Sequence, residues 1–181
     1  MLNALNCGHL TIVENYIRAK DKNEPALMST AFAEDATLEM ILKTESISFP
    51  AITDGLDAIT DILVRHFNDA YENVHTFCLA DKSDSTEYEL SCKWMVCMTE
   101  RKSGGVRMGT GNYRWTFDRE TDSRAVKLVI TIEQIAMLPS DVSEEIVNWA
   151  QGLPYPWCYS DTIRQTMPNI GQLNALRRSI A

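Results

Sequence analysis

The sequence predicts an α+β domain in which helices pack inside a curved antiparallel sheet. Before Tyr71, apolar residues recur with the 3.6-residue spacing of helices, and after it they alternate with the two-residue spacing of strands. Helices that come first, followed by long strands joined by short turns, favour an α+β architecture over a βαβ alternation. At 181 residues the chain is long enough to bury one core.

Three helices are predicted before the sheet. The first carries Leu10, Val13, Tyr16 and Ile17 on one face, and Thr11 with Glu14 has the spacing of a capping box. A second, shorter helix is expected to start at Asn23, with Pro25 in its first turn. Its predicted inner face is Leu27, Ala31 and Phe32.

A strand from Ala36 to Leu42 is predicted before the third helix. That helix should begin at Asp54 as its N-cap, because Asp accepts hydrogen bonds from the first free backbone N–H groups. The apolar stripe expected to face the core is Leu56, Ile59, Leu63 and Phe67.

Alternating residues then mark the strands of the sheet. Leu90, Cys92, Trp94, Val96 and Met98 form one apolar face, and Ser103-Gly104-Gly105 supplies a hairpin turn. The other strand-like runs are His75–Leu79, Tyr113–Phe117 and Val126–Ile132. Around residue 112 the alternation leaves open which pair of residues points inward, Thr110 with Asn112 or Tyr113 with Trp115, since a one-residue shift exchanges the faces.

After Leu138 the sequence becomes rich in short helical stretches and aromatic residues, so we divide the chain into a domain of helices and sheet, 1–138, and a helical extension, 139–181, packed on the same domain. Trp149, Tyr155, Trp157 and Tyr159 crowd this segment and are too apolar to stay in water. They can cover the body of the domain, the open mouth of a pocket between its helices and sheet, or the sheet of a partner. We favour the pocket mouth, the largest apolar surface that the helices would leave uncovered, where the segment would act as a lid.

Composition excludes several classes of partner. With 17 basic and 25 acidic residues the net charge is −8, which repels phosphate backbones and acidic membrane surfaces; neither nucleic acid nor membrane is expected as a partner. The N-terminal residues lack the basic and apolar pattern of a secretory leader, so we expect a cytoplasmic protein. The five cysteines, expected as reduced thiols, are Cys7, Cys78, Cys92, Cys97 and Cys158.

No metal site is predicted, because His9, His66 and His75 lie far apart in sequence without a metal-binding spacing. His9 is expected at the surface. His66 is explained by its place near the end of the third predicted helix, where a cation is favoured.

Three motifs resemble the nuclear transport factor 2-like superfamily, and its SnoaL-like branch in particular. They are Val13-Glu14-Asn15-Tyr16-Ile17, the stretch from Ala31 to Glu39 (AFAEDATLE), and the stretch from Ile52 to Ile59 (ITDGLDAI). The similarity covers about residues 9 to 138 and implies a cone-shaped fold with a pocket at its wide end. Members of this superfamily include isomerases, dehydratases, cyclases and proteins that only bind ligands, so the motifs indicate the fold better than the activity.

The resemblance also allows candidate site residues to be compared one by one. Tyr16 matches the tyrosine of the ketosteroid isomerases, but Met40 stands at the position of their catalytic base and cannot move a proton. Asp21 and His75 match the aspartate and histidine of the scytalone dehydratase-like members, whereas Met98 replaces a further histidine of those enzymes. A carboxylate bonded to one ring nitrogen raises the basicity of the other, which makes an Asp21–His75 dyad the catalytic candidate.

Two functions from different classes remain open, with a third beside them. The first is a cofactor-independent lyase or isomerase for a cyclic or aromatic substrate, in which His75 removes a proton, Asp21 orients it, and Tyr16 or Asn112 binds the developing oxyanion. The second is a non-catalytic binder of an apolar small molecule. The third is a structural subunit, like the small subunits of ring-hydroxylating dioxygenases. The predicted ligand-binding residues are Tyr16, Met40, Met98, Asn112, Tyr113 and Trp115.

A homodimer is also predicted. Ser91, Lys93, Met95, Cys97 and Thr99 alternate with the apolar face of their strand and form an outer surface that is only partly polar. Relatives commonly pair through this surface.

Overall fold

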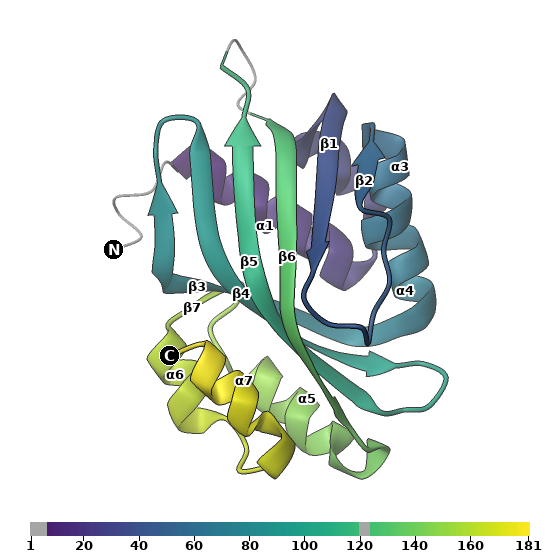
Figure 1. Cartoon of the computed structure of the whole chain (residues 1–181), viewed down its shortest axis with the longest axis vertical. Coiled ribbons are helices and arrows are strands. Elements are labelled where there is room, and N and C mark those ends of the chain that lie inside the picture. The colour runs from purple at the N-terminus through teal and green to yellow at the C-terminus, as the bar shows by residue number, and fades with distance from the viewer. Residues whose placement is uncertain (1–6, 120–123) are drawn as a thin grey trace.

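A computed structural model describes residues 7–119 and 124–181 and has the predicted α+β architecture (Figure 1). A seven-stranded sheet curves past the N-terminal helix α1 on one side and the C-terminal helices on the other. The N-terminal helical elements are α1 (Cys7–Lys22), a 3-10 turn (Pro25–Leu27), α2 (Met28–Ala31), α3 (Leu56–Thr60), a π-helical turn (Asp61–Arg65) and α4 (His66–Ala70). The strands are β1 (Phe32–Leu42), β2 (Ile52–Asp54), β3 (Tyr71–Ser85), β4 (Glu89–Glu100), β5 (Val106–Phe117), β6 (Ala125–Leu138) and β7 (Trp157–Cys158). The C-terminal helical elements are the 3-10 turn Ser140–Val142, α5 (Ser143–Gln151), α6 (Ser160–Thr166), the 3-10 turn Gly171–Leu173 and α7 (Asn174–Ser179).

The strand order is β2-β1-β6-β5-β4-β3-β7. From β3 to β6 the sheet is the predicted antiparallel meander, in which each strand pairs with the next along the chain. Two pairings are parallel, β1 with β6 and β3 with β7. The second ties the C-terminal segment to the sheet.

The helix starts differ from the predicted ones. Thr11 is not an N-cap: α1 already includes Cys7, and the Thr11 hydroxyl donates a hydrogen bond to the Cys7 carbonyl oxygen, as Thr does inside a helix. Asn23 has a positive φ of 55°, so the next turn starts at Pro25. Asp54 belongs to β2, where it accepts a hydrogen bond from Thr37 of β1 instead of capping α3.

The inner face of the sheet encloses the main core. Tyr113 and Trp115 both point into it with exposed fractions of 3% and 0%, which resolves the alternation that the sequence left open. The predicted face of β4, from Leu90 to Met98, lies in the same core. The helices supply Tyr16, Ile59 and Leu63 from the other side.

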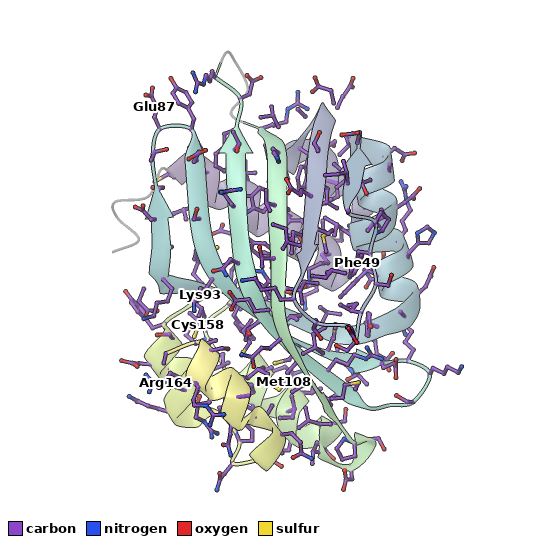
Figure 2. The ribbon with its side chains drawn as sticks, viewed as in Figure 1. Phe49, Glu87, Lys93, Met108, Cys158 and Arg164 are labelled. Carbon is purple, nitrogen blue, oxygen red and sulfur yellow. The ribbon has the colours of Figure 1, made fainter. Side chains whose placement is uncertain are left out.

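The outer face of the sheet carries a second core. Met95 and Cys97 of β4 are fully buried there, against apolar residues of the C-terminal helices such as Ile146 and Ile163. The lid prediction for residues 139–181 is therefore wrong: most of this segment covers the side of the sheet away from the helices α1 to α4. The same finding removes the argument for a homodimer through Ser91, Lys93, Met95, Cys97 and Thr99, because the C-terminal segment covers all of this surface except Ser91, which is exposed. Lys93, labelled in Figure 2, donates a hydrogen bond to the Ser179 carbonyl.

None of the helices in residues 7–119 and 124–181 is both long and apolar enough to cross a membrane.

Candidate functional site

A narrow apolar cavity opens between the N-terminal helices and the inner face of the sheet. Its volume is about 60 Å³. This is well below the ~300–1,000 Å³ of pockets that hold drug-sized ligands. Its lining residues are Tyr16, Lys20, Met40, Ile47, Phe49, Leu63, Phe67, Trp94, Val96, Met98, Gly109, Tyr113, Ile130, Ile132 and Ile135. A molecule bound in this space would be compact.

Simple periodicities bring these side chains together. Tyr16 and Lys20 are four residues apart on α1 and so share one face of the helix. Trp94, Val96 and Met98 are every second residue of β4 and so share one face of the sheet.

The loop between β1 and β2 forms part of the cavity wall. Its residues Ile47 and Phe49 line the space, and Phe49 stands beside helix α4 (Figure 2). Arg107 of β5 donates a hydrogen bond of 3.2 Å to the Ser46 carbonyl oxygen, which fixes the loop to the sheet. This loop lines the cavity, whereas the C-terminal segment contributes none of the residues that line it.

Tyr16 and Tyr113 both line the cavity. Their rings meet edge to face with centroids 5.8 Å apart. Burial raises the pKa of both phenols well above the usual value, so both hydroxyls keep their protons at neutral pH.

Lys20 and Asp21 form a buried ion pair at the cavity wall. The Lys20 ammonium donates hydrogen bonds of 2.8 Å to Asp21 Oδ1 and 2.6 Å to Thr76 Oγ1. Asp21 also accepts from the Thr76 amide at 2.6 Å, the Thr76 hydroxyl at 2.8 Å and the Tyr155 hydroxyl at 3.0 Å. With four donors around it, this carboxylate is saturated.

The predicted Asp21–His75 dyad is wrong. In the described parts of the chain no hydrogen bond joins these residues, and His75 Nδ1 lies 3.1 Å from the Asn73 carbonyl oxygen. The physical reason is strand alternation: Thr76, the next residue, points toward α1 and occupies the place beside Asp21 that His75 would need. His75 is also absent from the cavity wall.

The predicted ligand-binding residues divide into three groups. Tyr16, Met40, Met98 and Tyr113 line the cavity. Trp115 is buried deeper, packed against Tyr16 and Phe32, and does not reach the space. The prediction for Asn112 is wrong, because its side chain lies on the outer face and donates to Glu133.

Sequence reasoning missed Lys20 and the loop residues Ile47 and Phe49. Lys20 had a usable signal, since it lies one helical turn after Tyr16. No such pattern marks Ile47 and Phe49, because a segment without periodicity does not indicate where its side chains pack.

The polar groups of this wall can donate hydrogen bonds but have little capacity to remove a proton. The tyrosines remain protonated, the Lys20 ammonium is a donor, and Asp21 is saturated. Within residues 7–119 and 124–181, His, Cys, Asp and Glu side chains do not gather in any group of three that could hold a metal ion.

The chain matches no protein-family model and no curated protein in sequence. Solved structures match it in fold. One is a protein of unknown function from Burkholderia pseudomallei described as NTF2-like, that is, nuclear transport factor 2-like, with 12% identity, a TM-score of 0.57, and coverage of 79% of this chain and 97% of the other. Another NTF2-like protein, from Burkholderia thailandensis, has 14% identity, a TM-score of 0.55, and coverage of 71% and 92%.

A third similar structure is a hypothetical protein from Catenulispora acidiphila with a ketosteroid isomerase-like fold, in complex with trimethylamine. It has 16% identity, a TM-score of 0.52, and coverage of 66% of this chain and 82% of the other. At these identities the similarity establishes the fold alone.

Proposed function

We propose that this chain, which has the nuclear transport factor 2-like fold, is a non-catalytic binding protein for a compact apolar small molecule. One observation supports the proposal: the cavity is lined by apolar side chains and by hydrogen-bond donors. Asp21, the carboxylate beside it, already accepts hydrogen bonds from four donors. An isomerase or lyase needs a group that removes a proton, with a pKa near the working pH and within reach of the substrate. Neither Asp21 nor His75 meets that need.

The apolar wall supports binding of an apolar ligand. Burial of apolar surface contributes ~25 cal/mol per Å². Met40 and Met98 add flexible thioether side chains that adapt to the shape of a ligand. The structure from Catenulispora acidiphila, which holds trimethylamine, supports the capacity of this fold to bind small molecules.

Native mass spectrometry of the freshly purified protein tests the proposal, followed by titration with the neutral fluorescent probe N-phenyl-1-naphthylamine. Met98→Trp should fill the cavity and abolish binding of the probe. Met137→Trp is the matched control, because Met137 lies on β6 with an exposed fraction of 59% and should leave binding unchanged.

Two outcomes would contradict the proposal. Equal probe binding by the Met98→Trp variant and the wild type would place the ligand elsewhere. A co-purified ligand that is returned chemically altered after incubation with the protein would favour the lyase or isomerase instead.

A further inference from the structure

We propose that Lys20 is the polar anchor of the cavity and selects ligands that carry a neutral carbonyl oxygen. This inference rests on the proposed binding function and adds the chemical class of the ligand.

Lys20 lies at the cavity and is shielded from bulk water. Its side chain is 7% exposed, and the residue lines the cavity among apolar neighbours. The ammonium nitrogen lies over the Phe67 ring, 4.8 Å from its centroid, and Phe67 lines the cavity too. The charge is therefore at the cavity wall and not at the protein surface.

The ammonium has one donor left for a ligand. A lysine carries three N–H donors. Two of them are used by Asp21 and Thr76, and the third has as its described neighbour the Phe67 ring face, a weaker partner than an oxygen atom. A ligand oxygen in the cavity would complete this set.

The charge balance favours a neutral oxygen over a carboxylate. Lys20 is the charged residue of the cavity wall, and Asp21 already neutralises it at 2.8 Å. A carboxylate entering the apolar cavity would lose its hydration without an unpaired cation to compensate, which is costly. A ketone or aldehyde oxygen accepts a hydrogen bond and brings no net charge.

The C-terminal segment holds this arrangement in place. The Tyr155 hydroxyl donates to Asp21 Oδ2, and burial followed by the nearby Asp21 charge raises the pKa of Tyr155, which keeps that donor protonated. Tyr155 touches neither the cavity nor Lys20 directly in this network, so it is a positioning residue that acts through Asp21.

Three probes of one skeleton test the inference by calorimetry or ligand-observed NMR. They are 2-acetylnaphthalene, 2-ethylnaphthalene and 2-naphthoate, which present a neutral carbonyl, no polar atom and a carboxylate. The wild type should bind the ketone most tightly. In Lys20→Met the ratio of ketone affinity to hydrocarbon affinity should fall about tenfold, because the variant loses one hydrogen bond from a charged donor.

Two further variants control for misfolding and distinguish a positioning role of Tyr155 from a purely structural one. Lys20→Met leaves Asp21 as an unpaired buried charge, so the double variant Lys20→Met with Asp21→Asn removes both charges and should show the same loss of ketone preference. Tyr155→Phe should lower ketone affinity about twofold to threefold and leave hydrocarbon affinity unchanged, which a purely structural role would not do.

The outcomes distinguish the two proposals. A wild type that binds ketone and hydrocarbon equally, or a ketone preference that survives in the double variant, overturns the role of Lys20 and leaves the binding function intact. Tightest binding of 2-naphthoate overturns the neutral-oxygen class. If none of the probes binds to the folded protein, both the proposed binding function and the proposed role of Lys20 are contradicted.

Discussion

His9 is a buried histidine whose titration should make the fold sensitive to acid. We expected it at the surface, but it is 2% exposed and stacks on Phe117 with ring centroids 3.7 Å apart. Its Nδ1 atom is buried without a partner in the described parts of the chain, and burial lowers the pKa of the ring. Below pH ~6.5 the unfolded chain binds a proton that the folded chain resists, so stability is full above that pH and falls as the pH drops below it.

The expected result is a melting temperature that decreases from about pH 7.5 to about pH 5.5 in the wild type and decreases less in His9→Phe. Phenylalanine keeps the stack on Phe117 and removes the titration. Differential scanning calorimetry at several pH values measures both slopes. If the two proteins lose stability in parallel, another group is responsible.

Gly111 of β5 lies where any larger side chain would collide with Trp94 and with the backbone of β6. A Cβ atom at this position would lie 1.8 Å from the Thr131 carbonyl oxygen and 2.6 Å from Trp94 Cζ2. Because the oxygen belongs to the backbone of β6, the clash is not relieved by rotating a side chain. Gly111→Ala should lower the free energy of unfolding by at least about 3 kcal/mol.

Urea denaturation measures this change. Gly171→Ala is the control, because nothing lies within 4 Å of a Cβ atom there, and it should stay within about 0.5 kcal/mol of the wild type. Similar stabilities for the two alanine variants would show that β6 moves away from β5 at little cost.

At the scale of elements, the contact that fixes α6 to the sheet comes from a strand distant in sequence. Asp81 of β3 accepts a 2.7 Å hydrogen bond from the Ser160 amide and another from the Ser160 hydroxyl. Burial alone would raise the pKa of Asp81, but these hydrogen bonds outweigh it and lower the pKa. The stabilisation is present above the pKa of the unfolded chain, ~3.9, and is lost as the pH falls through the lower folded value.

Asp81→Asn should destabilise the protein by about 1–2 kcal/mol at neutral pH, since a charge-assisted acceptor is lost. Hydrogen exchange should quicken first in residues 160–166. Asp84→Asn is the matched control, because Asp84 is an exposed acid on the same strand. Unchanged exchange in α6 would contradict the assignment.

Elements with strong periodicity were predictable from the sequence, and the rest were not, for physical reasons. On α1 the spacing of Val13, Tyr16 and Ile17 predicted the buried face, and on β4 the alternation predicted the inner face. The start of α1 was missed because a threonine hydroxyl bonds equally well to a carbonyl one turn back. The dyad failed because two neighbouring strand residues, His75 and Thr76, point to opposite faces, and the sequence does not say which of them meets Asp21.

At the scale of the whole molecule, the chain itself covers the inner face of the sheet and one end of its outer face (Figure 1). The inner face lies against α1, and the part of the outer face around Met95 and Cys97 lies against residues 139–181. Both faces of β4 are accordingly apolar in its central part, where Val96 and Met98 face the cavity while Met95 and Cys97 face the C-terminal helices. The sequence showed an apolar C-terminal segment and an apolar outer face, but it did not show that the two meet.

Truncation after Leu138 should therefore impair folding and solubility rather than ligand binding alone. It would expose Phe77, Leu79, Met95, Cys97 and Met108, each of which is at most 2% exposed in the full chain. Burial of one large apolar side chain contributes about 1.5–3 kcal/mol, so the loss for this group is comparable with the whole stability of a domain, about 5–15 kcal/mol. Sedimentation and thermal melting should show a truncated protein that self-associates and melts far lower than the full chain.

Supplying the missing segment provides the control for that experiment. Residues 139–181 co-expressed as a separate chain should restore a soluble protein, because β7 and the helices can dock on the uncovered sheet without the peptide link at residue 138. Restoration should also return ketone selectivity to the cavity, since Tyr155 again reaches Asp21. A truncated protein that stays monomeric with an unchanged melting temperature would contradict a structural role for the segment. In that case the apolar outer face would be tolerated in water, against the usual limit of a few hundred Å² for a contiguous exposed apolar patch.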